Sequence, residues 1–153
     1  MADGKRARRS ARAVAMDLLA RREHSETELR TKLTARDFTS DEIDATLAGL
    51  ARDGLLSNER FTEAFIAART RRGQGPVRIR VELEARGIGA ALIGAGLEDI
   101  DWFALAREAR HRKFGPGAPA DYAERARQAR FLQYRGFTGE QIRSALDDAG
   151  DND

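Results

Sequence analysis

The sequence predicts an all-α protein built as an elongated array of three tandem three-helix repeats. Its composition is rich in alanine, leucine, arginine and glutamate and poor in β-branched and aromatic residues, a mixture typical of helices. Apolar side chains recur at helical spacings, and Ser, Thr or Asp stands where several helices would begin. A set of apolar positions also recurs about every 50 residues, which indicates tandem repeats.

The repeat is visible in the register of four apolar positions, whose internal spacings are 5, 5 and 4 each time. The three sets are Leu33, Phe38, Ile43 and Leu47; Leu83, Ile88, Ile93 and Leu97; and Leu132, Phe137, Ile142 and Leu146. An arginine follows the first position of each set by three residues, and a small turn-forming residue comes next. These pairs are Arg36–Asp37, Arg86–Gly87 and Arg135–Gly136. Such small residues can take the left-handed conformation that ends a helix. Because one unit buries little apolar surface alone, we expect neighbouring repeats to pack together.

The first repeat is expected to span residues 11–56, after a disordered basic tail at residues 1–10. Its first helix fits residues 11–22, where apolar side chains form one stripe. The second and third helices each begin at a capping box, in which two side chains satisfy orphan backbone donors reciprocally. The two boxes are Ser25 with Glu28 and Thr39 with Glu42.

The second repeat is expected to span residues 57–100. Asn58 can cap its first helix, and Pro76 suits the first turn of its second helix. The third helix, from about Gly89 to Leu97, contains further glycines and has no capping box, so we expect the weakest helix of the chain there.

The third repeat is expected to span residues 101–150. Asp101 can cap its first helix, which would end at residues 114–115 before a proline-containing loop. Asp121 with Glu124 opens the second helix, and Thr138 with Gln141 opens the last.

Positive charge is concentrated between the first two helices of the second repeat, although the net charge of the chain is only +2. No acidic residue occurs between Ala64 and Val81, and a cluster of this kind attracts polyanions or acidic protein surfaces. Further cations lie on the first and second helices of the third repeat, and together they could form one basic face. The candidate partner-binding residues are Arg69, Arg71, Arg72, Gln74, Arg78, Arg80, Arg110, Arg112, Lys113, Arg127 and Arg130.

Signals for catalysis, a metal or a cofactor are poor, so we predict a protein that is not an enzyme and uses neither. The chain has no cysteine, and its two histidines, His24 and His111, lie in highly charged stretches where we expect both to be exposed. The segment Gly73-Gln74-Gly75 lacks the lysine and the glycine spacing of a phosphate-binding P-loop. With no apolar run long enough to span a bilayer and no signal-peptide core, we expect a soluble, cytoplasmic monomer.

A helix-turn-helix DNA reader is the main alternative, since a three-helix unit can place its last helix in the major groove. The third helices carry acidic residues, among them Asp41, Glu42 and Glu140, which phosphates would repel. The basic face therefore suits a long groove in a partner better than a base sequence. A nucleic-acid-binding protein that acts alone, such as a transcription regulator, remains the second hypothesis.

Several segments, in this order and spacing, resemble the bacterial RecX regulators of the RecA recombinase. They cover roughly residues 13–147. The segments are Leu18-Leu19-Ala20-Arg21-Arg22-Glu23-His24-Ser25 followed by Glu28-Leu29; Gly54-Leu55-Leu56 followed by Arg60-Phe61; Arg72-Gly73-Gln74-Gly75-Pro76 with Arg78-Ile79, Glu82-Leu83 and Arg86-Gly87-Ile88; and Ala129-Arg130-Phe131-Leu132 with Arg135-Gly136-Phe137 and Ile142. The central segment is the most specific of them.

The resemblance implies a non-enzymatic regulator that acts in DNA repair, homologous recombination and the SOS response. Members of this family bind RecA and its DNA filament along the helical groove, and they inhibit ATP hydrolysis, strand exchange and co-protease activity. The family fold is an array of three-helix repeats, which agrees with the register above. The resemblance implies RecA as the partner, with a possible weak DNA contact, but it does not assign the contacting residues one by one.

Overall fold

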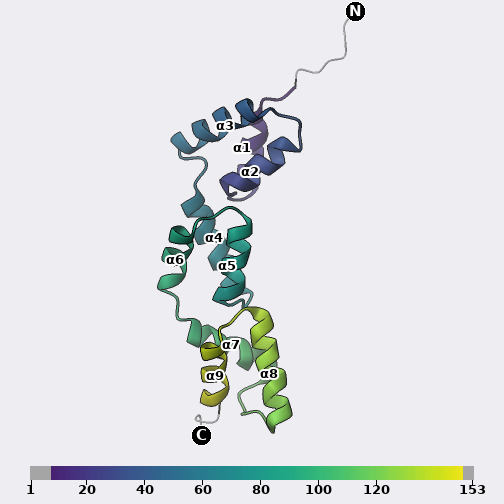
Figure 1. Cartoon of the computed structure of the whole chain (residues 1–153), viewed down its shortest axis with the longest axis vertical. Coiled ribbons are helices and arrows are strands. Elements are labelled where there is room, and N and C mark those ends of the chain that lie inside the picture. The colour runs from purple at the N-terminus through teal and green to yellow at the C-terminus, as the bar shows by residue number, and fades with distance from the viewer. Residues whose placement is uncertain (1–7, 150–153) are drawn as a thin grey trace, which may run out of the picture. The chain divides into compact units, whose positions relative to one another are not determined.

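The computed structural model describes residues 8–149, and within that range the chain forms nine helices and no strand (Figure 1). The helices are α1 Ala11–Arg21, α2 Glu26–Thr34, α3 Ser40–Arg52, α4 Asn58–Arg71, α5 Pro76–Ala85, α6 Ala90–Glu98, α7 Trp102–Phe114, α8 Tyr122–Arg135 and α9 Gly139–Asp148. The all-α prediction is confirmed. Most of the predicted tail, residues 1–7, lies outside the described residues, and residues 8–10 precede α1.

Most helices begin at the residues that the sequence indicates. Ser25 and Thr138 form complete capping boxes with Glu28 and Gln141, and Asp121 accepts a hydrogen bond from the Glu124 amide at 2.9 Å. Thr39 and Asp101 accept hydrogen bonds from the Glu42 and Ala104 amides, but the predicted box at Thr39 lacks the return bond from the Glu42 side chain. Ser10 caps α1 and was not among the predicted caps.

The cap of α4 was predicted wrongly. Asn58 is the first residue of the helix, and the Ser57 hydroxyl accepts from the Arg60 amide at 3.1 Å. The Asn58 side chain instead accepts a hydrogen bond from the Glu26 amide at 2.9 Å, at the start of α2. Ser57 and Asn58 are adjacent and both belong to the residue types that favour a cap, so the local sequence did not separate them.

The left-handed helix ends were predicted correctly. Asp37 has φ 67°, Gly87 has φ 78° and Gly136 has φ 102°, so each of the three residues that follow the recurrent arginines reverses the chain. Asp37 is the only described residue other than glycine with positive φ, and aspartate tolerates this region better than most residues.

The chain divides into two compact units, which we describe separately. The first holds the residues up to Ala64 together with Arg86–Ile88. In it, α1, α2 and α3 pack around a core that includes Val14, Leu29, Leu33, Ile43, Leu47 and Leu50. The second holds Phe65–Ala85 and the residues from Gly89 onward. Its buried residues include Ile79, Leu83, Ile93, Trp102, Leu132 and Ile142, and α7 packs against both α8 and α9.

In the second unit, the start of α5 meets the end of α8. The Gly75 amide donates to the Arg135 carbonyl at 2.8 Å, and the Val77 amide donates to the Gly136 carbonyl at 2.9 Å. Orphan donors at one helix start are therefore satisfied by orphan acceptors at another helix end. A Cβ on Gly75 would lie 2.5 Å from the carbonyl carbon of Gly136, so only glycine fits this approach.

A corresponding close approach occurs in the first unit. A Cβ on Gly87 would lie 2.7 Å from the Cβ of Thr27, in the first turn of α2. Each contact joins the turn after the second helix of one predicted repeat to the start of the second helix of the preceding one. The turns at Gly87 and Gly136 are therefore the places where one predicted repeat packs against the second helix of the preceding repeat.

Candidate functional site

The second unit contains a pocket of about 170 Å³, which we call the basic pocket. Its walls come from three places in the chain, namely the turn after α4, the last turns of α7 and the last turn of α8. The lining residues are Arg72, Gly73, Ala109, Arg112, Lys113, Phe131 and Arg135. Four of them are cationic and none is acidic, so the pocket suits an anion.

Arg135 holds one wall of the basic pocket in place. Its guanidinium donates to the Arg72 carbonyl at 2.9 Å and lies over the Phe131 ring, 5.0 Å from the centroid. A cation over an aromatic face is stabilised by the ring quadrupole. Arg135 is one of the three arginines that recur in the repeat register at the end of a helix, and the structure shows its side chain reaching the turn after α4.

Phe131, the aromatic residue of the pocket, is held in place by a second aromatic ring. Phe131 packs edge-to-face against Phe114, with the ring centroids 5.3 Å apart. The Lys113 ammonium lies 5.9 Å from the Phe131 centroid, and the Arg127 guanidinium lies 5.1 Å from the Phe114 centroid. The pair therefore forms an apolar base with cations arranged around it.

Arg110, a predicted partner-binding residue, is buried, with only 3% of its surface exposed. It donates to Gln128 Oε1 at 2.9 Å and to the carbonyls of Gly115 and Gly117. Burial lowers the pKa of its guanidinium from the ordinary value. Arg110 thus holds the loop between α7 and α8 from inside the unit.

Three members of the predicted basic cluster between Arg69 and Arg80 also face partly or wholly inward. Gln74 is buried, and Arg69 lies 3.5 Å from Glu82 and over the Phe65 ring, 4.6 Å from its centroid. Arg78 is half-buried, lies 3.5 Å from Glu82 as well, and extends over Tyr134 at 5.6 Å. Arg78 and Glu82 are an i,i+4 pair on α5, which local spacing can indicate, but the contact of Arg69 with Glu82 joins α4 to α5 and gave no such signal.

The remaining predicted residues are exposed. Arg72, Arg112 and Lys113 line the basic pocket, while Arg71, Arg80 and Arg130 do not. Arg127 forms two hydrogen bonds with Glu124, and these lower the pKa of that carboxyl. The structure therefore brings three of the predicted residues together around a cavity and adds Arg135 and Phe131, neither of which was predicted to belong to a site.

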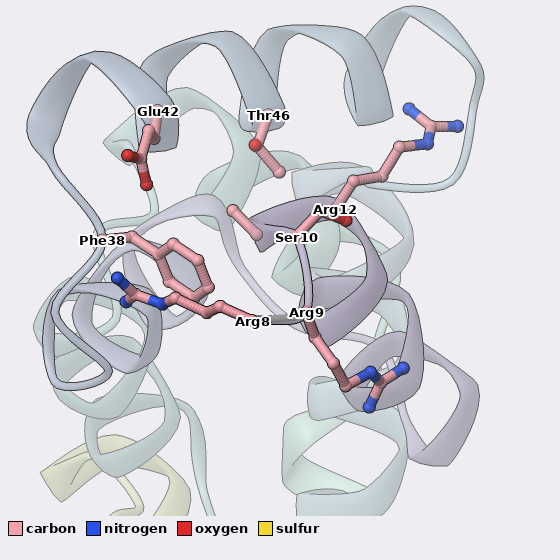
Figure 2. Close-up of a pocket in the computed structure, with 8 residues that line it drawn as sticks. Arg8, Arg9, Ser10, Arg12, Phe38, Glu42 and Thr46 are labelled. Carbon is pink, nitrogen blue, oxygen red and sulfur yellow. The ribbon is translucent and has the colours of Figure 1, made fainter. Parts of the chain in front are cut away.

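Two further pockets differ in character. In the first unit, Arg8 lies along the Phe38 ring, while the guanidinium groups of Arg9 and Arg12 point away from it (Figure 2). Arg9 pairs with Asp17, Arg12 pairs with Asp53 at 2.9 Å, and Glu42 lines the same pocket. The positive charge of this pocket is therefore largely balanced.

In the second unit, a shallow groove is lined by Val77, Arg78, Val81, Glu82, Gln133, Tyr134 and Gly136.

His24 was predicted to be exposed, and this was wrong. It is buried between α1 and α2, where Nδ1 lies 3.1 Å from the Arg22 carbonyl and Nε2 lies 2.9 Å from Lys32 Nζ. Burial lowers the pKa of its imidazole, which favours the neutral ring with Nδ1 donating and Nε2 accepting. His111 is exposed, as predicted.

Within the part of the chain that the structure describes, no three His, Cys, Asp or Glu side chains are grouped so that they could hold a metal ion. None of the described helices has the length and apolar character that a membrane crossing requires.

Comparison with known proteins identifies the family. Three family models match in tandem, namely the first three-helix domain of RecX at residues 11–50, the second at 57–97 and the third at 99–146. The regulatory protein RecX of Halorhodospira halophila is 46% identical over 155 residues, which cover 100% of this chain and 96% of that protein. The regulatory protein RecX of Pseudomonas savastanoi pv. phaseolicola is 47% identical over 144 residues, 93% of each chain.

Solved structures show the same fold. A crystal structure of regulatory protein RecX matches with a TM-score of 0.77 at 19% identity, over 90% of this chain and 71% of the other. The crystal structure of RecX from Lactobacillus salivarius matches with a TM-score of 0.76 at 17% identity, over 91% and 94%. With three tandem domain matches and this identity over full length, the chain belongs to the RecX family of regulatory proteins.

Proposed function

We propose that this protein regulates the RecA recombinase by binding RecA on its DNA filament and inhibiting ATP hydrolysis, strand exchange and co-protease activity. It does so by binding, without catalysing a reaction. Support comes from the family, whose curated members bear the name regulatory protein RecX. The resemblance of the central segment to that family names RecA as the partner.

The observation that carries the proposal is the basic pocket with its exposed surroundings. Arg72, Arg112 and Lys113 meet there from two helix ends, and Arg71 lies next to Arg72 on the exposed surface. A nucleoprotein filament is a repeating polyanion, so a surface of this charge gains both attraction and fast association. Gln74 and Arg110 are buried and do not form part of the proposed contact surface.

Inhibition follows if the bound protein blocks filament growth. A protein bound at a growing end or in the groove occupies surface that an incoming subunit needs, whereas preferential binding to the filament alone would stabilise the filament. Inhibition of hydrolysis would then reflect fewer active protomers rather than chemistry at the nucleotide.

The test adds the purified protein to RecA on single-stranded DNA and follows ATP hydrolysis at increasing protein concentration. We expect dose-dependent inhibition that weakens strongly when Arg72 and Arg112 are both replaced by alanine. Arg52→Ala with Arg143→Ala is the matched control, since both arginines are exposed and neither lines the pocket. Undiminished hydrolysis at saturating protein would refute the proposal.

Sequence-specific binding to bare duplex DNA would favour the second hypothesis, a transcription regulator. Acidic residues occupy the first turns of α3 and α9, the last helices of two repeats, which argues against their insertion in a major groove.

A further inference from the structure

We propose that the shallow groove between α5 and α8 is a protein-contact site, which takes an apolar side chain of the RecA surface from a segment with acidic flanks. The inference rests on the proposed function and deepens it, because it adds an apolar contact that does not depend on salt to the charged contact at the basic pocket. It is carried by the exposed apolar side chains of the groove, its fixed shape and the excess of positive charge at its rim.

Three side chains of the groove expose half or more of their surface. The exposed fraction is 50% for Val77, 59% for Val81 and 76% for Tyr134. The two valines are one turn apart on α5 and form one stripe, and Tyr134 on α8 lines the same groove. Single exposed apolar residues are ordinary, but a group of them around one hollow is typical of an interaction site.

The groove has a fixed shape, because α5 and α8 are joined at one end of it. The Val77 amide donates to the Gly136 carbonyl at 2.9 Å. The Arg78 guanidinium lies over the Tyr134 ring, 5.6 Å from the centroid, and its Nε is 3.5 Å from Glu82 Oε1. A surface that is formed before binding loses less conformational entropy when a partner arrives.

The form of the groove favours a protein surface over a small molecule. It has a volume of about 380 Å³ but is shallow, whereas a small ligand is ordinarily held in a cavity that covers most of its surface. A side chain that projects from a protein needs no deep cavity, because the surrounding contacts exclude water from it.

The only carboxylate that lines the groove is already engaged by two arginines. Glu82 Oε2 is 3.5 Å from Arg69 Nε, and Glu82 Oε1 is 3.5 Å from Arg78 Nε. Two cations therefore meet one carboxylate, and this part of the groove keeps a positive charge.

Two further arginines stand at the rim. Arg80 precedes Val81 on α5, and Arg130 lies one turn before Tyr134 on α8. Both are exposed, and neither forms an ion pair in the described part of the chain. Glu84, one turn beyond Arg80, is also exposed but does not line the groove. Positive charge is thus in excess, and it complements a segment that carries carboxylates beside its apolar side chain.

The groove is less suited to a nucleic-acid strand. The Arg78 guanidinium already occupies one face of the Tyr134 ring, so a base could stack only on the other face. Val77 and Val81 offer neither a stacking surface nor a hydrogen bond to a phosphate.

The test measures binding of the full-length protein, labelled at its N-terminus, to preformed RecA filaments on single-stranded DNA. Fluorescence anisotropy gives the affinity across a salt series. Tyr134→Ala should weaken binding roughly tenfold, as is usual for an aromatic side chain that becomes buried in an interface. Val77→Thr with Val81→Thr should weaken it roughly fivefold, because threonine keeps the β-branched shape and replaces only one methyl group by a hydroxyl.

The response to salt separates the two kinds of contact. The loss in the Tyr134 and valine variants should be the same at low and high salt, since screening acts on charges. Arg80→Ala with Arg130→Ala should weaken binding at low salt and have little effect at high salt. Tyr122→Ala is the matched control, because Tyr122 is an exposed tyrosine of α8 outside the groove, and it should bind like the parent. The replaced side chains are exposed, so helicity by circular dichroism should be unchanged.

The outcomes distinguish this inference from the proposed function. If the parent binds the filament and the folded Tyr134 and valine variants bind equally well, the groove is not a contact site, although the proposed function stands. A loss confined to low salt would overturn the apolar contact. If Tyr134→Ala weakens binding to bare oligothymidylate by the same factor, the groove binds nucleic acid and not protein. Failure of the parent to bind the filament would overturn both proposals.

Discussion

At the scale of single residues, the arginines of this protein divide into those that hold the fold and those that remain available. Arg110 is buried among the Gln128 side chain and two carbonyls of the loop between α7 and α8. Arg72 and Arg112 have similar chemistry but lie exposed at helix ends. What separates them is whether the fold supplies acceptors for the guanidinium, since a buried charge without them is very costly.

Replacing Arg110 by alanine should therefore destabilise the second unit. The change removes hydrogen bonds from a charged donor and leaves Gln128 Oε1 with one partner fewer, so we expect a loss of about 2–4 kcal/mol in the free energy of unfolding. Urea denaturation checks this, with Arg112→Ala as the matched control. An Arg110→Ala midpoint equal to that of the control would contradict the assignment.

His24 should make stability depend on pH. Its folded-state pKa is lowered from the ordinary 6.5 by burial, so the unfolded chain binds the proton more readily. The stabilisation is present above about pH 6.5 and is lost as the pH falls below it, with a slope of at most ~1.4 kcal/mol per pH unit. The charges around the ring are the cations Arg22 and Lys32 and the carboxylate Glu28.

The measurement is chemical denaturation of the parent, His24→Gln and His111→Gln at pH 7.5 and pH 5.5. Glu28 retains its charge in this window: burial raises the pKa of its carboxyl, but the hydrogen bonds from Arg22 and the Ser25 amide outweigh burial and lower that pKa overall. The parent and His111→Gln should lose stability together on acidification, and His24→Gln should lose less. An equal loss in all three proteins would show that His24 is not responsible.

At the scale of elements, the glycines have opposite roles. Gly75 allows α5 to begin directly against the end of α8, whereas Gly94 lies within α6 with nothing within 4 Å of the position that a Cβ would take. The same residue type is thus required at a junction and costly within a helix.

Alanine at these two positions should change stability in opposite directions. Gly75→Ala drives a Cβ against backbone atoms of Gly136 and Phe137 that cannot move independently, so we expect several kcal/mol of destabilisation or separation of the two helix ends. Gly94→Ala should stabilise by about 0.5–1 kcal/mol. Thermal unfolding of both variants is the test, and destabilisation of similar size in both would be inconsistent with these opposite roles.

Helix α6 should open more readily than its counterpart α3. Its N-cap, Gly89, makes no side-chain hydrogen bond, while Thr39 caps α3 through the Glu42 amide. We expect faster amide hydrogen exchange in Ala90–Glu98 than in Ser40–Arg52. Comparable protection factors in the two helices would show that packing of the buried Ile93 and Leu97 compensates for the missing cap.

At the scale of the whole molecule, the proposed interaction is electrostatic and should respond to salt. Replacing Arg71, Arg72 and Arg112 together by alanine should cost a few kcal/mol of filament affinity, at roughly 1–3 kcal/mol per charged contact. The reduction should be largest at low salt, because screening already weakens such contacts at high salt.

The matched control is Arg21, Arg52 and Arg143 replaced together, which removes the same formal charge from exposed positions outside the basic pocket. Inhibition of RecA ATP hydrolysis across a salt series compares the two triple variants. If both lose inhibition equally, net charge and not the pocket accounts for the effect.

The sequence by itself determined the helices, most of their caps, the left-handed turns and the repeat register. These depend on interactions within a few residues, such as Ser25 with Glu28, or on a positive φ at Gly136, and local spacing records them directly. The same register also indicated that the repeats pack on one another, since no short unit can bury its apolar stripe alone.

Only the tertiary structure decided which polar residues face inward and which form the basic pocket. Arg135 and the Arg72 carbonyl are 63 positions apart, and the partners of Arg110 and His24 lie on other elements or loops. A sequence shows that a stretch is positively charged, but the burial and neutralisation of each charge depend on acceptors that folding brings near it. For this reason the Arg69–Arg80 cluster was visible from the sequence, while its division into inward-facing and exposed cations was not.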